Sequence, residues 1–172
     1  MSFTTLIADI EALTRQHAML IVPVVGLISF CESIVFLSLF IPASVILMGI
    51  GALVGLGDAN PWAVVAAATI GAALGEWASY AVGYVFKDRA TKLWPLGRYP
   101  DLVVRGQRFV HAWGALGLFA AKFIGPLRGI VPMMAGVMAM GPVRFQVANW
   151  FSSLLWALVW LAPGYIAVRA LH

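Results

Sequence analysis

The sequence predicts an all-α polytopic membrane protein made of two inverted repeats, each a re-entrant helical hairpin followed by a transmembrane helix. The first observation is composition: 62% of the 172 residues are hydrophobic and 10% are charged, whereas soluble domains carry roughly 25% charged residues. The second is a pair of long apolar intervals with at most one charged residue each, and the third is a pair of apolar stretches broken by glycine and proline. This composition excludes a soluble enzyme, a nucleic-acid-binding protein and a disordered chain.

Two intervals are long enough to cross a membrane, which takes about 20 apolar residues. Residues 61–86 contain Glu76 as their one charged residue, and residues 143–168 contain only Arg144 near the start. In the first interval, small residues recur at every fourth position, and such a ridge lets another helix pack at close range. The residues of this ridge are Ala67, Gly71, Gly75, Ser79 and Gly83. Because Glu76 lies beside the ridge, we expect it to face protein or a cavity rather than lipid.

Residues 28–57 and 109–142 are predicted to be re-entrant hairpins. The first is broken by Pro42 and several glycines, and the second by Gly125-Pro126 and further glycines. Non-helical backbone at membrane depth is tolerated only where it is buried in protein or lines a wet cavity. One span follows each hairpin, so the second unit is inverted relative to the first. Interrupted segments in corresponding positions are typical of transporters with inverted repeats.

The remaining segments flank these units. Residues 1–16 carry apolar residues at three- and four-residue spacing, which predicts an amphipathic N-terminal helix lying either on the membrane surface or on the protein's own helices. Residues 17–172 form a single membrane domain, within which the linker 87–108 carries six basic and two acidic residues. Because basic loops resist translocation, we expect this linker to face the cytoplasm.

Four ionisable residues fall at membrane depth: Glu32, Glu76, Lys122 and Arg128. Each costs roughly 2.5–3.5 kcal/mol at a helix centre, so partners or functions are expected for them. One interpretation is a pair of buried salt bridges that lock the hairpins together. The other, which we favour because buried bridges stabilise weakly, is a cavity in which two cations bind a phosphate and two carboxylates exchange protons.

Several motifs resemble one family of membrane proteins. Residues 118–165 contain a basic residue, the spacing F-I-x-x-x-R, a P-x-x-A-G element, then Met, Phe, Asn and Trp, and a closing G-Y. Residues 70–86 contain G-x-x-x-G, an acid, a Tyr and a Gly, and residues 30–53 are similar to a first hairpin. Together these stretches resemble the DedA family, also called the SNARE-associated or VTT domain, over roughly residues 28–166.

The resemblance implies a fold of two inverted re-entrant hairpins with spans, a bacterial inner-membrane location, and transport of lipid across the bilayer by a flippase or scramblase. Bacterial members are implicated in moving undecaprenyl phosphate or phospholipids, with dependence on the proton motive force. By position, Lys122 and Arg128 match a pair of arginines and would bind the substrate, while Glu32 matches the first-hairpin acid. Glu32 and Glu76 are the residues expected to couple protons. The acid usual after the hairpin proline is replaced by Ser44, which leaves open whether transport is coupled to protons.

Other classes of protein fit the sequence less well. The three histidines are scattered and no G-x-S-x-G motif occurs, so we do not expect an enzyme. No metal and no cofactor are expected, the expected partners are phosphate-headed membrane lipids, and self-association stays open. A small-solute or ion transporter and a structural or assembly protein of the membrane are the alternatives that remain.

Overall fold

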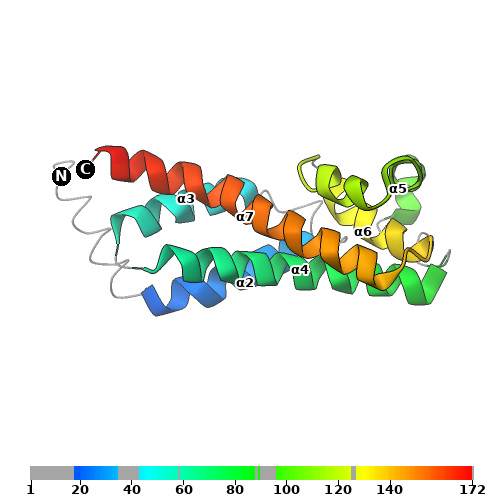
Figure 1. Ribbon diagram of the computed structural model, residues 1–172, viewed down its shortest axis with the longest axis horizontal. Coiled ribbons are helices and arrows are strands. Elements are labelled where there is room, and N and C mark those ends of the chain that lie inside the picture. The colour runs from blue at the N-terminus through cyan, green and yellow to red at the C-terminus, as the bar shows by residue number, and fades with distance from the viewer. Residues whose placement is uncertain are drawn as a thin grey trace.

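The chain is described by a computed structural model, which covers residues 18–34, 43–57, 59–87, 89, 96–124 and 127–171. Within these ranges the structure is helical and contains no strand. The predicted helix 1–16, Pro42 and the Gly125-Pro126 pair lie outside the described residues. The described part forms an elongated bundle, drawn with its long axis horizontal in Figure 1.

Two long helices run along this axis in opposite directions (Figure 1). Helix α4 spans Pro61–Phe86 and α7 spans Pro142–Leu171. At about 1.5 Å per residue, the 26 residues of α4 reach about 39 Å, more than the roughly 30 Å hydrocarbon core of a bilayer. Both helices are long and apolar enough to cross a membrane, and they coincide closely with the predicted spans 61–86 and 143–168.

Four shorter helices pack against the two long ones. Helix α2 (Ala18–Ser33) packs on α4, and α3 (Ala43–Leu56) packs on α7. Helix α6 (Leu127–Val137) packs on α4 and on α5 (Pro100–Ala121), which also contacts α7. In Figure 1 the α2–α3 pair lies along one half of the long helices and the α5–α6 pair along the other half. The all-helical architecture with two candidate spans confirms the predicted all-α membrane class, whereas the inverted repeats and the re-entrant hairpins stay predictions.

The helices differ in extent from the segments predicted on the sequence, whose grouping into hairpins stays a prediction. Helix α2 begins at Ala18 rather than at residue 28, and α5 begins at Pro100, inside the segment predicted as the linker 87–108. Proline suits the first turn of a helix because its fixed φ is already helical. Arg105 and Arg108 are exposed, so these charges lie on an outer helix face and do not end the helix. A short 3₁₀ turn, η2 (Leu96–Arg98), precedes α5.

Helix α5 is kinked at Gly114. The backbone there has φ +52° and ψ −128°, a conformation open to glycine because it has no β-carbon. The kink divides α5 into two shorter helical segments. The α5–α6 pair therefore contains no straight helix that matches α4 in length.

The predicted ridge of α4 is where two of the short helices make their closest approach. A β-carbon at Gly71 would collide with the carbonyl oxygen of Gly26 on α2, and one at Gly83 would collide with the carbonyl oxygen of Met133 on α6. Small residues therefore allow α2 and α6 to lie against successive parts of the same helix. Helix α7 holds α3 similarly, because a β-carbon at Gly164 would meet the carbonyl oxygen of Met48.

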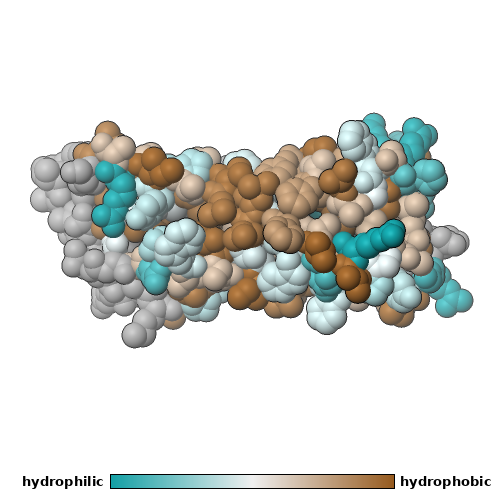
Figure 2. All heavy atoms as spheres, in the orientation of Figure 1, coloured by the Kyte–Doolittle hydropathy of each residue, from teal (hydrophilic) through white to brown (hydrophobic). Residues whose placement is uncertain are grey.

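Two apolar clusters fill the interior. One combines Tyr80 of α4 with residues of α5, α6 and the start of α7, and the other combines Val25 of α2 with residues of α3, α4 and the second half of α7. On the face shown in Figure 2, hydrophobic side chains gather over the middle and hydrophilic ones toward the ends. Large apolar side chains such as Phe151 and Leu155 of α7 are exposed. A bilayer supplies the apolar surroundings that this middle band requires.

Candidate functional site

The four ionisable residues predicted at membrane depth are all buried. Glu32 lies in the last turn of α2, Glu76 near the middle of α4, Lys122 directly after α5, and Arg128 at the start of α6. Their exposed fractions are 3%, 1%, 2% and 5%, in the same order. We call these four residues the ionic centre. It forms where the inner ends of α2, α5 and α6 reach the middle of α4.

The ionic centre consists of two salt bridges. The Arg128 Nη1 atom lies 2.5 Å from Glu32 Oε1, and the Lys122 Nζ atom lies 2.9 Å from Glu76 Oε1. The first bridge joins the α5–α6 pair to the α2–α3 pair, and the second joins the end of α5 to the long helix α4. Each cation therefore contacts a carboxylate from another part of the fold, and the pair of buried salt bridges named as the first interpretation of the sequence is present.

Polar side chains of α7 and α2 support these bridges. Lys122 Nζ also donates to Ser153 Oγ at 2.5 Å, and Ser153 Oγ lies 3.3 Å from Asn149 Oδ1. Asn149 Nδ2 in turn donates to the carbonyl oxygen of Ala73 on α4 at 2.9 Å. Arg128 Nη2 lies 3.4 Å from Ser33 Oγ. Lys122 is thus fixed by both long helices, and Arg128 is fixed by two consecutive residues of α2.

An aromatic ring completes the surroundings of Arg128. The Cζ atom of its guanidinium lies 4.4 Å from the centre of the Trp156 ring on α7, within the range of a cation–π interaction. Trp156 is fully buried, and burial strengthens such an interaction because water does not compete for the cation. Arg128 thus contacts α2 through its nitrogens and lies over an aromatic ring of α7.

The sequence predicted no role beside the salt bridges for Ser33, Asn149, Ser153 or Trp156, although Asn149 is the Asn of the motif within residues 118–165. A signal for the last three was present: they follow one another at four and three residues along an otherwise apolar span, which places them on one helix face. Ser44, the residue that departs from the resembling family, has a side chain outside the described part of the structure.

The chemistry available at the ionic centre is that of paired charges. Among the described residues there is no group of three His, Cys, Asp or Glu side chains that could hold a metal ion. Each carboxylate of the ionic centre instead faces a cation, and two buried cations can bind an anion when it replaces a carboxylate. The predicted roles of Lys122 and Arg128 in substrate binding, and of Glu32 and Glu76 in proton coupling, stay predictions.

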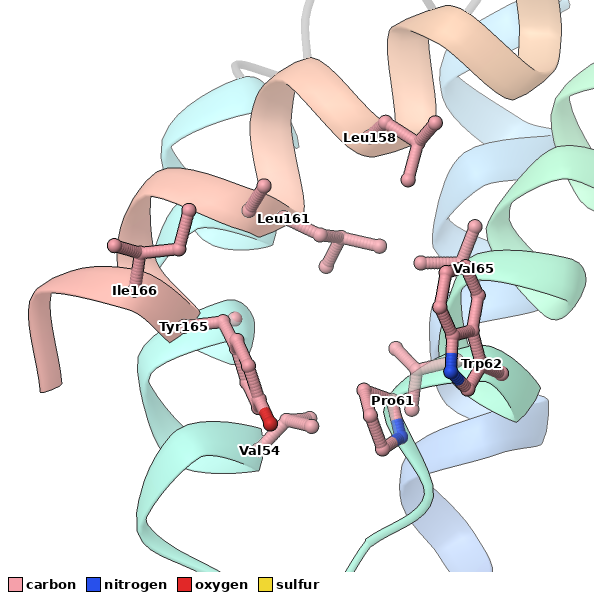
Figure 3. Close-up of a pocket in the computed structure, with 11 residues that line it drawn as sticks. Val54, Pro61, Trp62, Val65, Leu158, Leu161, Tyr165 and Ile166 are labelled. Carbon is pink, nitrogen blue, oxygen red and sulfur yellow. The ribbon is translucent and has the colours of Figure 1, made fainter. Parts of the chain in front are cut away.

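A separate apolar cavity of about 320 Å³ lies between α3, α4 and α7. Figure 3 shows side chains of all three helices around it, among them Val54, Trp62, Leu161 and Tyr165. None of the residues that line it is charged, and none belongs to the ionic centre. The cavity is therefore separate from the ionic centre. The four charged side chains of the ionic centre are buried among other side chains of the protein.

Comparison with known proteins identifies the family. The family model of the VTT domain matches residues 41–166, a region that includes Glu76, Lys122 and Arg128. The chain belongs to the VTT-domain family, also called DedA. The resemblance proposed from the motifs is thereby confirmed.

Relatives of this VTT-domain protein include two proteins of Escherichia coli strain K12. The inner membrane protein YabI is 29% identical over 164 residues, which cover 95% of this chain and 65% of YabI. The inner membrane protein YqjA is 29% identical over 144 residues, which cover 83% of this chain and 66% of YqjA. An uncharacterized membrane protein of Buchnera aphidicola (subsp. Schizaphis graminum) is 27% identical over 91% of this chain and 62% of its own length.

The VTT-domain chain therefore spans a little under two thirds of these relatives. The names of YabI and YqjA confirm the predicted location of the family in the bacterial inner membrane. No solved structure gives a significant match to the chain.

Proposed function

We propose that this VTT-domain protein transports a phosphate-headed lipid across the bilayer, as a flippase or scramblase. The observation that carries this proposal is the ionic centre: two cations, Lys122 and Arg128, buried where helices of both short pairs meet the two long helices. Buried charges at membrane depth are costly and typically mark substrate or ion pathways. Undecaprenyl phosphate and phospholipids are the candidate substrates.

The two cations suit a phosphate for different reasons. The guanidinium of Arg128 already uses two nitrogens at once, one for Glu32 and one for Ser33, and the same fork can engage two phosphate oxygens. Lys122 supplies a second positive charge from the adjoining end of α5. A phosphate that entered the ionic centre would take the place of the carboxylates as the counter-ion, so the cations would stay neutralised at every stage.

We propose further that the carboxylates link this exchange to protons. Protonation of Glu32 or Glu76 removes the negative charge that now holds Arg128 or Lys122, and the freed cation then binds the lipid phosphate. Loss of the proton would restore the salt bridge and release the lipid. Proton movement and lipid movement would then be coupled through the same two bridges.

The membrane arrangement that serves this function is a pair of re-entrant hairpins inserted from opposite faces, as predicted from the sequence. Helices α2, α3 and α6 contain 16, 14 and 11 residues, too few to cross a bilayer, and α5 is broken at Gly114. Each pair would then enter the membrane partway and bring its inner end to the ionic centre. Lipid would reach the centre from one leaflet and leave toward the other.

A second candidate function is supported by the same bridges. Both salt bridges are complete and buried, as expected if they only lock the short helix pairs onto the bundle. In that case the protein would be a structural or assembly component of the membrane. The two candidates differ in whether lipid moves, because a lock needs no turnover. Neither candidate involves catalysis, and we therefore propose that the protein is not an enzyme.

The proposal is tested with purified protein in vesicles that carry a fluorescent lipid, by measuring how much of the lipid becomes accessible to a membrane-impermeant quencher. We expect rapid exchange of a phosphate-headed lipid, slow exchange of a neutral-headed lipid, and loss of exchange in Arg128→Ala. Arg105→Ala is the matched control because Arg105 is exposed on α5. Exchange no faster than in protein-free vesicles would favour the structural candidate.

A further inference from the structure

Trp156 is the aromatic residue in contact with the ionic centre, and it has a property that packing does not explain. Its side chain is fully buried, and its ring lies 4.4 Å from the Arg128 guanidinium. The indole Nε1 of Trp156 has no hydrogen-bond partner among the described residues. Buried N–H groups are nearly always paired in native proteins, so this donor needs an explanation.

Arg128 holds a second such donor. Its Nη1 and Nη2 atoms contact Glu32 and Ser33, but its buried Nε has no partner within the described part of the chain. The two unpaired donors belong to neighbouring buried side chains, since the Arg128 guanidinium lies over the Trp156 ring. One of the two side chains carries a positive charge. An acceptor placed there would therefore be anionic or strongly polar.

We propose that Trp156 is a headgroup-binding residue: its indole N–H and the Nε–H of Arg128 together bind oxygen atoms of the lipid phosphate. This inference rests on the proposed function and adds a residue to its site. The Trp156 ring would also keep its contact with the guanidinium while the phosphate replaces Glu32 as the counter-ion. Trp156 would thus keep Arg128 in place during the exchange of one counter-ion for the other.

Trp160 provides a matched control on the same helix. It lies one turn further along α7, and its buried Nε1 is also without a partner among the described residues. Trp156 and Trp160 both pack in the apolar cluster around Val25 and Leu161, but no cation lies over the Trp160 ring among the described contacts. The difference between the two residues is therefore the guanidinium of Arg128, which lies over the Trp156 ring and has an unpaired nitrogen of its own.

The experiment compares Trp156→Phe with Trp160→Phe in the full chain. Phenylalanine keeps an aromatic face but removes the N–H. Binding of dodecyl phosphate is measured in detergent from the shift of the unfolding temperature, and lipid exchange is measured in vesicles. We expect Trp156→Phe to weaken dodecyl phosphate binding and to slow exchange, each by about tenfold or more, as for loss of a hydrogen bond to a charged group. Trp160→Phe should match wild type in both.

A purely structural role for Trp156 predicts a different pattern. Without ligand, removing an unsatisfied buried N–H should leave the unfolding temperature unchanged or raise it, so a loss of binding in a stable Trp156→Phe protein cannot come from misfolding. Wild-type binding and exchange in that variant would overturn the proposal. If Trp156→Phe gives no folded protein, Trp156→Tyr takes its place, because the hydroxyl of tyrosine lies elsewhere on the ring than the indole N–H. We expect the same losses of binding and exchange in Trp156→Tyr, and wild-type binding and exchange would again overturn the proposal.

Two further comparisons show which ligand binds and which of the two proposals fails. Inorganic phosphate is measured beside dodecyl phosphate, and a response to inorganic phosphate alone would assign the donors to a free anion and overturn the lipid assignment. Arg128→Ala separates the two proposals: normal exchange in that variant contradicts the proposed function itself. Lost exchange in Arg128→Ala with normal exchange in Trp156→Phe contradicts only the role of Trp156.

Discussion

The salt bridge between Lys122 and Glu76 allows a quantitative test of how the ionic centre is held in the folded protein. Both side chains are almost fully buried and their charged atoms lie 2.9 Å apart. Removing one partner of such a pair leaves a buried charge without its counter-ion, which typically costs about 3–5 kcal/mol, whereas replacing both partners by neutral groups is often close to neutral. Glu76→Gln and Lys122→Met are suitable changes because they nearly preserve side-chain volume.

We expect Lys122→Met alone to lower the free energy of unfolding by about 3–5 kcal/mol, because Glu76 stays behind as an uncompensated charge. The double variant should lie within about 1 kcal/mol of wild type. If Glu76→Gln alone costs a similar amount, the coupling energy in the double-mutant cycle would be at least about 5 kcal/mol, above the roughly 0.5–3 kcal/mol typical of residues in contact, because each single change leaves a buried charge unpaired. The assay is reversible unfolding in detergent, with Arg105→Met as a control on an exposed charge.

Additive effects would refute this reasoning. If the double variant loses as much stability as the sum of the single variants, Lys122 and Glu76 do not compensate one another's charge in the folded protein. A single Lys122→Met variant as stable as wild type would likewise contradict the buried pair, since an isolated carboxylate inside the bundle should be costly.

Three further predictions concern other parts of the molecule. Arg128→Lys should lose lipid exchange almost as fully as Arg128→Ala, because an ammonium cannot replace a planar guanidinium that contacts two residues and lies over an aromatic ring. Lys122→Arg should keep lipid exchange. Full exchange by Arg128→Lys would contradict the proposed role of the guanidinium. Gly71→Ala should lower the free energy of unfolding by about 1–3 kcal/mol through overpacking against Gly26, while Gly49→Ala, which meets open space on α3, should not destabilise. In intact cells with Cys31 replaced, a cysteine at position 97 should resist an impermeant thiol reagent and one at position 60 should react, because basic loops tend to stay in the cytoplasm. The reverse labelling pattern would contradict the predicted topology.

The long helices were predictable because their signal is local. A run of about 20 apolar residues is needed to cross a bilayer, and α4 and α7 each supply one. The ridge of α4 was predictable for the same reason, since small residues at every fourth position lie on one face of a helix. The start of α5 at Pro100 was not predicted, because the many charges of residues 87–108 indicated a loop. Arg105 and Arg108 instead lie on an exposed helix face.

The members of the ionic centre could also be identified from the sequence, since charges at membrane depth are rare. Their pairing could not, because it depends on where α2, α5 and α6 end against the long helices. Glu32 and Arg128 are 96 residues apart in the chain, and no local pattern relates them. The contacts that Asn149, Ser153 and Trp156 make beside the bridges were missed because uncharged residues stand out less than charges in an apolar span.

The distinction between a lipid-binding centre and a structural lock is tested most directly by lipid exchange in the double variant Glu32→Gln/Arg128→Gln. Both charges of the bridge are removed together, so no charge of this pair stays buried alone and the protein should remain folded. Exchange of a phosphate-headed lipid is then measured in vesicles containing equal amounts of folded wild-type or variant protein. We predict that the folded double variant exchanges lipid no faster than protein-free vesicles, because the cation that binds the phosphate is gone. Exchange at the wild-type rate would contradict the proposed function.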